Sequence, residues 1–569
     1  MSVDTEWVFQ TPDPGTVRRL VTELGVPEPV ARAVANRGYT DPRSARRFLE
    51  PSPGEINRPS SLPDIGAAVE RIEAALDRDE TIAVYADRDV DGISGAAVLV
   101  TLLRDLEAAV EYCVPGKWDG YGLHADHVDE LAASGTDLLL TVDCGTTALE
   151  EVGRANDAGM DVVVTDHHQP EGRLPEAVAC VNPRRDDSAY PHDGLAGGAV
   201  AFKLGQALVE SRAPTRIERY HRYALPLAAL ATVGDYVPLD LENRAIVREG
   251  FDRLFDCGLV GLVETASHVG VESVRDVSWS LVPLLNAGQE AEAGEFTLEV
   301  LLERDPARCS TAIERLEGYR EERRRERAER REHLRECVEA QIDPETADVL
   351  VVEVQRYVGG GAMSQLSEEW GRPVVTYRRR DGGYRGGGRT APDVDLLEVF
   401  EASSDLLEEY WGHPGAAGFK VSPGNLEPFV AGIAETVRTR YEVDAFRPTV
   451  EIDGRLDPDR LDRSLLEELA RLEPFGNGNA EPEYLLEGVE VARCEFFGDD
   501  ERHCKLFPAG DAEEVAFTVV CWDGAGSFED VVDGGLVADP AVYDIVGTLS
   551  FDDYAGTPQV NVTDYRRRE

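Results

Sequence analysis

The sequence predicts an α/β protein with a parallel-sheet domain, a long connecting helix, a smaller α/β domain and a C-terminal β-barrel. Between residues 81 and 166, short apolar runs alternate with helical stretches, as in βαβ units on a parallel sheet. Residues 303–342 form one charged stretch whose mixed-sign charges follow helical spacing. The tail from residue 447 consists mostly of strand-like runs with regular turn signals, which indicates a small barrel such as an OB-fold.

The length of 569 residues predicts several domains, because single hydrophobic cores rarely grow beyond about 250 to 300 residues. Helical periodicity near the N-terminus predicts a lead-in that packs on the domain after it. The expected ranges are 1–75 for the lead-in, 76–302 for the parallel-sheet domain, 303–342 for the connecting helix, 343–446 for the second α/β domain and 447–569 for the barrel.

The composition is strongly acidic, with 109 acids against 58 Lys and Arg residues and a formal net charge of -51. The bases include only four lysines, Lys117, Lys203, Lys420 and Lys505. Such a surface is typical of a salt-saturated cytoplasm, where screening within about 3 Å at 1 M salt removes the self-repulsion, so we expect a salt-adapted protein. In molar salt counterion release no longer drives nucleic-acid binding, and a polyanion would need metal ions, hydrogen bonds and stacking.

The cysteines and the apolar runs bear on the cellular compartment. Nine cysteines are scattered without a C-x-x-C pair, which predicts neither a zinc ribbon nor a disulfide framework. The sequence contains neither a recognisable signal peptide nor a run of 18 apolar residues, so we expect a cytoplasmic protein without a membrane partner.

A cluster of acids follows the first predicted strand, in the stretch TIAVYADRDVDGIS (81–94). Asp87, Asp89 and Asp91 lie so close together that their carboxylates would repel one another unless cations lay between them, and the alternative is a solvated acidic turn. Asp143 and Asp166 end two later strands, and open parallel sheets place their ligands outside the carboxyl ends of the strands. The expected convergence of these acids on one crevice favours a metal site.

Further candidates are less specific when judged by residue type alone. His167 and His168 follow Asp166, so one imidazole could bind metal while the other faces substrate. Asp235 is equally well explained as a loop acid. The pair Gly197-Gly198 could admit a phosphate, but close helix packing is the favoured interpretation.

The second half of the chain offers candidate contacts to nucleic acid, each with a structural alternative. Arg389 after Gly386–Gly388 could bind phosphate or belong to a glycine hairpin, and His413 could touch substrate or cap a helix. The charges of the long helix are best explained by pairing along a solvated helix. The alternative is a stripe of arginines that binds along DNA. In the barrel, three aromatic residues could stack on bases or could belong to the core: Trp522, Phe551 and Tyr554.

Taken in order, the motifs resemble the DHH phosphoesterases, named for the triplet Asp166-His167-His168, and among them the RecJ-type single-strand exonucleases. The resemblance covers nearly the whole chain. The matching stretches are ARAVANRGYTDPRSARRFLEPS, ADRDVDGIS, TVDCGT, VVVTDHH, LAGGAVAFKL, LATVGDYVPLDLENR, GGGRT, WGHPGAAGF and LEPFGNGNAEP. It implies that the three folded parts are a DHH domain, a DHHA1 domain and an OB-like barrel.

The resemblance also implies a two-metal centre that holds Mn²⁺ or Mg²⁺. Asp166 would orient the site, His168 would face the scissile phosphate, and Arg389 and His413 would contact phosphate from the second domain. The metal ligands would be Asp89, Asp91, Asp143, His167 and Asp235, with Asp87 as a ligand or a supporting residue.

The implied function is a metal-dependent exonuclease that degrades single-stranded DNA from a 5′ end to 5′-mononucleotides in repair and recombination. The alternatives are a DHH phosphodiesterase for short RNA or cyclic dinucleotides, and a RecJ-like subunit of a replicative helicase complex. The partners would be single-stranded nucleic acid, DNA rather than RNA, and a replication or repair complex. Three departures from the family pattern leave polarity and sugar preference open: GGGRT for GSxRS, Trp411-Gly412-His413 for GGH, and PLLNAGQ (283–289) without its arginines.

Overall fold

The computed structural model describes residues 5–568 apart from several short gaps. The gaps are 291–292, 345, 381, 391–393, 442–448, 499–500, 510–516, 523, 525–531, 534–535 and 553–554. The described chain forms two compact units. The large unit contains Pro12–Arg320 and Arg463–Pro482, and the second unit contains Met1–Thr11, Glu321–Asp462 and Glu483–Glu569.

A five-stranded parallel sheet forms the centre of the large unit, as the βαβ pattern predicts. Its strands run in the order β3-β2-β4-β5-β6, and all neighbouring pairs are parallel. Their bounds are β2 (Thr81–Ala86), β3 (Ala109–Cys113), β4 (Leu138–Val142), β5 (Asp161–Thr165) and β6 (Ala179–Val181). The chain runs outward from β2 to β3 and then returns to β4 on the other side of β2, so the topological switch point lies between β2 and β4.

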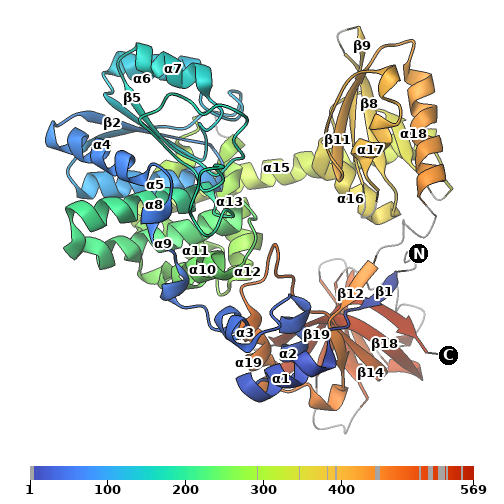
Figure 1. The fold of residues 1–569 in the computed structure, drawn as a ribbon. Helices are drawn as coiled ribbons and strands as arrows, with labels where there is room; N and C mark the ends of the chain where they lie inside the picture. Colours follow the sequence, from blue (N-terminus) through green and yellow to red (C-terminus); the bar gives the residue numbers. More distant parts are fainter. Residues whose placement is uncertain are drawn as a thin grey trace. The chain divides into compact units, whose positions relative to one another are not determined.

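Helices cover both faces of this sheet (Figure 1). Alternate strand residues point to opposite faces, so Val84 packs in one apolar cluster while Tyr85 packs in the other. The first face is covered by α4 (Ile65–Asp77), α5 (Val90–Asp105), α8 (Gly197–Arg212) and α9 (Ile217–Gly234). The second face is covered by α6 (Ala125–Ser134) and α7 (Leu149–Asp157).

The lead-in is helical, as its periodicity predicts, and two of its helices begin at aspartate caps. Asp13 accepts a hydrogen bond from the amide of Thr16, and Asp41 accepts one from the amide of Ser44. The lead-in helices are α1 (Pro14–Leu24), α2 (Glu28–Asn36) and α3 (Pro42–Leu49). The remaining helices of the large unit are α10 (Leu241–Arg253), α11 (Val260–His268), α12 (Val274–Asp276), α13 (Val282–Leu285), α14 (Phe296–Leu302) and α19 (Arg463–Leu469).

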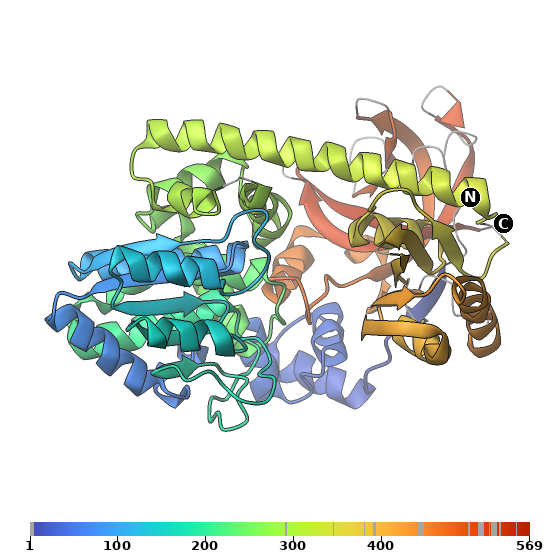
Figure 2. The ribbon, with the colours of Figure 1, turned by 90° about the horizontal axis from the view of Figure 1, so that it is seen from above.

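The charged stretch forms the long helix α15 (Pro306–Gln341), whose course is clearest in Figure 2. Its side chains pair along the helix, for example Arg330 with Glu326 at 2.8 Å. Its central residues are mostly exposed, which fits the solvated, self-paired interpretation. Among the described residues, this and every other helix is too short or too polar to cross a bilayer.

The second unit contains a mixed sheet in the order β10-β11-β9-β8-β7. Its strands are β7 (Leu350–Glu353), β8 (Val374–Arg380), β9 (Gly383–Arg389), β10 (Leu407–His413) and β11 (Ala416–Val421). The helices beside it are α16 (Gly360–Trp370), α17 (Leu396–Glu401) and α18 (Leu426–Arg440). The predicted smaller α/β domain is therefore present.

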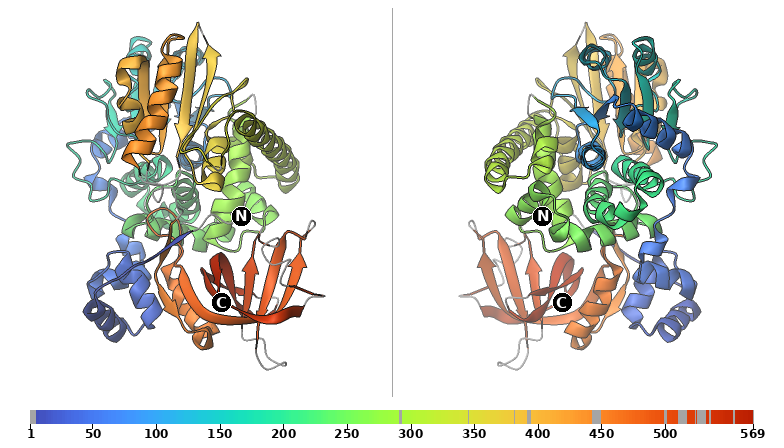
Figure 3. Two further views of the ribbon diagram at one scale, coloured as in Figure 1. Left: turned by 90° about the vertical axis from the view of Figure 1, so that its right-hand side faces the viewer. Right: turned by 90° about the vertical axis from the view of Figure 1, so that its left-hand side faces the viewer.

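The C-terminal strands close into the predicted OB-like barrel, because β14 pairs with both β15 and β18 (Figure 3). The barrel strands are β14 (Tyr484–Phe497), β15 (His503–Pro508), β16 (Thr518–Cys521), β18 (Leu536–Asp552) and β19 (Thr557–Arg567). Short strands beside it are β1 (Glu6–Phe9), β12 (Thr449–Ile452), β13 (Gly454–Leu456) and β17 (Val532–Asp533). Trp522 exposes 56% of its surface and Phe551 is half-buried, whereas Tyr554 lies outside the described residues.

Candidate metal centre

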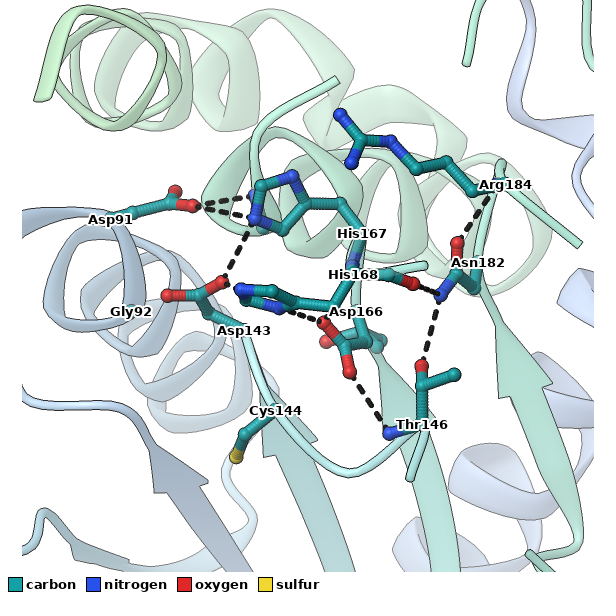
Figure 4. Close-up of polar contacts among 12 residues, drawn as sticks. Asp91, Gly92, Asp143, Cys144, Thr146, Asp166, His167, His168, Asn182 and Arg184 are labelled. Atoms are coloured by element: carbon teal, nitrogen blue, oxygen red, sulfur yellow. Dashed lines mark hydrogen bonds and ion pairs between the residues drawn. The ribbon is translucent and has the colours of Figure 1, made fainter. Parts of the chain in front are cut away.

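The acids that end the parallel strands do converge at the switch point of the sheet. Asp87 follows β2 and Asp143 follows β4, which are the two strands that flank the switch point, and Asp166 follows the next strand, β5. Figure 4 shows Asp143 and His167 turned toward each other, with His167 Nε2 3.2 Å from Asp143 Oδ1. The crevice predicted from the strand ends is therefore a real cluster of side chains.

Three groups of side chains place one potential ligand atom each within 4.8 Å of one another. The groups are Asp91, His167 and Asp235; Asp87, Asp89 and Asp143; and Asp143, His167 and His168. Together they contain all six residues that the family resemblance implies as metal ligands. His167 Nε2 lies 3.6 Å from Asp235 Oδ2 and 3.7 Å from Asp91 Oδ2, so Asp235 is a member of the cluster rather than an ordinary loop acid.

Asp91 is held by the first turn of α8. The amides of Gly197 and Gly198 each donate a 2.7 Å hydrogen bond to one of its carboxylate oxygens. A Cβ atom on Gly198 would lie 2.7 Å from the Cβ atom of Ala231, and one on Gly95 of α5 would lie 2.8 Å from the Cα atom of Gly198. The glycine pair thus allows close helix packing, as expected from the sequence. It also orients the carboxylate of Asp91.

The other two acids of the first motif are held by their own loop. Asp89 caps α5, since its Oδ1 accepts hydrogen bonds from the amides of Asp91 (2.9 Å) and Gly92 (3.1 Å). A Cβ atom on Gly92 would lie 2.3 Å from the carbonyl oxygen of Asp87, so this turn requires glycine. The local sequence therefore fixes the Asp89 carboxylate at the start of α5 and packs the backbone of Asp87 closely against Gly92.

The backbone of Asp143 is left-handed, with φ at 60°, and the residue is 3% exposed. Such a conformation is uncommon outside glycine and costs about 1–3 kcal/mol, although aspartate adopts it more readily than most residues. Gly197 approaches it so closely that a Cβ atom there would lie 2.6 Å from the Cβ atom of Asp143. The position of this carboxylate is thus fixed by close packing.

The site contains buried polar atoms that lack a hydrogen-bond partner among the described residues. They are Asp87 Oδ1, Asp143 Oδ1, and Nδ1 and Nε2 of His167. Burial and then the charge of Asp89 raise the pKa of Asp87 to about 6, and burial and neighbouring carboxylates raise the pKa values of Asp91 and Asp143 well above their usual range. Such a set of hard oxygen donors with one imidazole suits divalent cations, which would neutralise the charge and satisfy the unpaired atoms.

His168 and Asp166 form a separate arrangement beside the cluster. Asp166 Oδ1 lies 2.8 Å from His168 Nδ1 and accepts a 2.7 Å hydrogen bond from the amide of His167. Burial opposes ionisation of Asp166, but the hydrogen bond and charge of His168 outweigh it and hold the pKa of Asp166 below its usual value. The side chain of His168 is 43% exposed, whereas that of His167 is 6% exposed, so the two imidazoles face different surroundings.

Three side chains that sequence reasoning missed support this arrangement. Asn182 Nδ2 donates to the carbonyl of His168 at 2.9 Å, and the hydroxyl of Tyr121 lies 2.9 Å from His168 Nδ1. Asn286, in the PLLNAGQ stretch, accepts a 3.0 Å hydrogen bond from the amide of Val90 at the start of α5. In the sequence, Tyr121 is marked by its two flanking glycines and Asn286 by its place in PLLNAGQ, whereas nothing marks Asn182.

Arg389 and His413 belong to the second unit and lie in one row across its sheet. Both residues are in register with Ala416 of β11, Arg389 from β9 and His413 from β10. His413 is a strand residue, so the helix-cap alternative is wrong. Arg389 is the last residue of β9, which pairs with β8 as an antiparallel hairpin, so the glycine-hairpin description does apply to it. A Cβ atom on Gly360 would lie 2.5 Å from Arg389 Nη2, which places the guanidinium at the start of α16.

Comparison with known proteins supports a single family. Residues 81–232 match the DHH family, N-terminal domain, and residues 452–564 match the RecJ OB domain. The single-stranded-DNA-specific exonuclease RecJ of Dickeya dadantii is 31% identical over 81% of this chain and 84% of its own length, and that of Thermus thermophilus is 31% identical over 99% and 78%. A crystal structure of RecJ from Thermus thermophilus in complex with Mn²⁺ superposes with a TM-score of 0.76 at 28% identity, covering 99% of this chain and 80% of that one.

The match therefore extends from the first strands of the parallel sheet to the C-terminal barrel. The chain belongs to the RecJ family of single-stranded-DNA-specific exonucleases.

Proposed function

We propose that the protein is a metal-dependent exonuclease that hydrolyses phosphodiester bonds of single-stranded DNA. The observation that carries this proposal is the complete ligand cluster at the switch point, in which buried carboxylate and imidazole atoms lack other partners among the described residues. The relatives with this domain order are named single-stranded-DNA-specific exonucleases, and the related structures are complexes with Mn²⁺ and with Mg²⁺. Mn²⁺ or Mg²⁺, two ions per site, is accordingly the proposed cofactor.

The residues divide into two ligand groups that meet at Asp143. Asp91, His167 and Asp235 would hold one ion, and Asp87, Asp89 and Asp143 the other. Asp143 Oδ1 lies 3.2 Å from His167 Nε2, so Asp143 is suited to bridge the groups. When bound there, divalent cations would supply Lewis-acid chemistry that lowers the pKa of a water and offsets negative charge on the phosphate.

The remaining residues orient and contact the substrate phosphate in this proposal. Asp166 fixes the imidazole of His168, which is the exposed member of the pair and can donate a hydrogen bond to a nonbridging oxygen. Tyr121 contacts the same ring nitrogen of His168 as Asp166 does, and Asn182 donates to the backbone carbonyl of His168. Arg389 and His413 would supply further phosphate contacts from their shared row in the second unit.

The finer assignments extend the family's pattern. We propose 5′ to 3′ polarity, release of 5′-mononucleotides and a role in DNA repair and recombination. The net charge of -51 with only four lysines supports a salt-rich archaeal cytoplasm as the setting. The RecJ-type barrel favours long single strands over dinucleotides as the substrate. The complete ligand set favours an enzyme over a noncatalytic helicase subunit. An enzyme of this kind could still associate with a replication or repair complex.

The deciding experiment is a nuclease assay at molar salt on DNA and RNA strands labelled at either end, with Mn²⁺, Mg²⁺ or EDTA. We expect metal-dependent release of labelled mononucleotide first from 5′-labelled DNA. A dinucleotide cleaved in preference to a long strand would support the phosphodiesterase alternative instead. Absence of cleavage with every metal and strand would refute the enzymatic proposal.

A further inference from the structure

Tyr236, which directly follows the cluster residue Asp235, combines an unfavourable backbone with an exposed ring. Its φ is 56°, in the left-handed region, and 66% of its surface is exposed. A bulky residue in this region is a genuine outlier, and such outliers persist only where the surroundings impose them. Glycine would adopt the same backbone without strain. The tyrosine side chain is therefore not explained by the fold.

The surroundings that impose this conformation come from a distant part of the chain. Asn477 Nδ2 donates a 2.8 Å hydrogen bond to the carbonyl of Tyr236, and the carbonyl of Asn477 accepts a 2.8 Å hydrogen bond from the amide of Leu239. Asn477 thus forms hydrogen bonds to both ends of the loop 236–239. Asn243 Nδ2 adds a 2.9 Å hydrogen bond to the carbonyl of Pro238.

Asn477 is itself held rigidly within LEPFGNGN (472–479). The guanidinium of Arg244 is fully buried and donates to the carbonyls of Leu472 (3.0 Å), Glu473 (2.8 Å) and Pro474 (3.2 Å). Asn479 Nδ2 donates to the carbonyls of Leu472 and Pro474. All these residues belong to the large unit, so the motif forms a fixed clamp on the loop beside the metal centre.

We propose that Tyr236 stacks on a base of the bound strand next to the metal centre, and that Asn477 is the positioning residue that holds it there. This inference rests on the proposed function, because it assigns a contact to the same substrate. An exposed aromatic ring offers a face on which any base can stack, and stacking does not weaken with salt as phosphate contacts do. A protein with a net charge of -51 in molar salt gains most from a contact of this kind.

The test compares the full chain with its Tyr236→Gly variant on strands that carry one abasic nucleotide at successive positions. Binding is measured by fluorescence anisotropy with Ca²⁺, which occupies oxygen-donor sites, and cleavage is measured with Mn²⁺. We expect the native chain to bind about tenfold more weakly when one particular base is missing. Tyr236→Gly should bind the intact strand as weakly, lose sensitivity to that abasic position and unfold at an equal or higher temperature.

Four further variants complete the design. Tyr236→Phe keeps the ring and should keep the abasic effect. Phe255→Ala removes another exposed ring of the same unit, 47% exposed and outside the metal cluster, and should leave binding unchanged. Asn477→Ala should weaken binding as Tyr236→Gly does, while the same change made on the Tyr236→Gly background should weaken binding no further.

The outcomes separate this inference from the proposed function. Equal abasic profiles for the native chain and Tyr236→Gly would overturn the stacking role even if cleavage is normal. A native chain that shows the abasic effect but cleaves no strand would refute the exonuclease proposal and leave the stacking role standing. Failure of the native chain to bind any strand would overturn both.

Discussion

The backbone amide of Gly197 donates a 2.7 Å hydrogen bond to Oδ2 of Asp91. Gly197 begins α8 and Asp91 lies in the first turn of α5, so the starts of two helices from distant parts of the chain meet at one carboxylate. The positive end of α8 favours the charged form of that carboxylate. The orientation of a proposed metal ligand thus depends on the absence of a side chain at position 197.

Replacement of Gly197 by alanine should damage the site although alanine favours helices. The added Cβ atom would lie 2.6 Å from Asp143 Cβ and 2.7 Å from Asp143 Oδ1, so both Asp91 and Asp143 would shift. We expect Mn²⁺ affinity and kcat to fall by about 10- to 100-fold, as for other residues that orient ligands. Titration calorimetry and cleavage assays would measure this. Gly153→Ala in α7, where a Cβ atom meets nothing within 4 Å, is the matched control and should leave both values unchanged.

Asp143→Asn should abolish cleavage and raise the stability of the metal-free protein. The asparagine keeps the shape but removes a buried negative charge, whose cost is reflected in the raised pKa of Asp143. Thermal unfolding with and without Mn²⁺ would show a higher midpoint in EDTA and a smaller gain on adding metal. Cleavage at the native rate would contradict the assignment of Asp143 as a metal ligand.

Asn182→Ala should lower kcat more than it changes KM. The asparagine donates to the carbonyl of His168 and to the hydroxyl of Thr146, so its loss frees the residue that is proposed to contact the phosphate. We expect a fall of about 10- to 100-fold in kcat. Steady-state kinetics would check this, and a change in KM alone would point to strand binding instead.

The buried pair Lys203 and Glu242 should control stability rather than activity. Lys203 Nζ lies 2.8 Å from Glu242 Oε1, and the two side chains are 0% and 1% exposed. Lys203→Met would leave the carboxylate of Glu242 buried without its cation, at a cost of about 3–5 kcal/mol in the free energy of unfolding. The double variant Lys203→Met, Glu242→Leu should recover much of that loss, as measured by chemical denaturation.

The same pair should make stability fall in acid. Burial raises the pKa of Glu242, but the charge and hydrogen bond of Lys203 outweigh it, so the folded pKa lies below the ordinary value of 4.5. The stabilising contribution is therefore present above about pH 4.5 and is lost as the pH falls through the folded pKa. On going from pH 7 to below pH 4.5, the native chain should therefore lose more stability than the double variant, as unfolding curves at the two pH values would show.

The sequence was sufficient to predict the residues that follow regular strands. Asp87, Asp143 and Asp166 each end an apolar run, and the parallel arrangement brings such ends together. Asp235 required the family resemblance, because it follows a helix and no periodicity connects a helix end to the crevice. Its place near His167 arises from the packing of α9, which becomes visible only in three dimensions.

Other contributions could not be predicted because they join distant segments through single hydrogen bonds. Asn182 supports His168 by its side chain, and Asn477 clasps a loop more than two hundred positions away in the sequence. Residue type gives no signal for such contacts, since asparagine is common in turns for local reasons. The sequence shows that Trp411 and PLLNAGQ depart from the family pattern. The effect of these changes depends on contacts that form only in the folded chain.

The segment Arg463–Pro482 also constrains the order in which the protein can mature on the ribosome. It belongs to the large unit, yet the chain reaches it only after residues 321–462 of the second unit. Until then the guanidinium of Arg244 lacks the carbonyl partners of residues 472–474, and the loop after Asp235 lacks its clasp. Because chains emerge N-terminus first, the second α/β sheet is synthesised before the loop after Asp235 can gain the hydrogen bonds of Asn477.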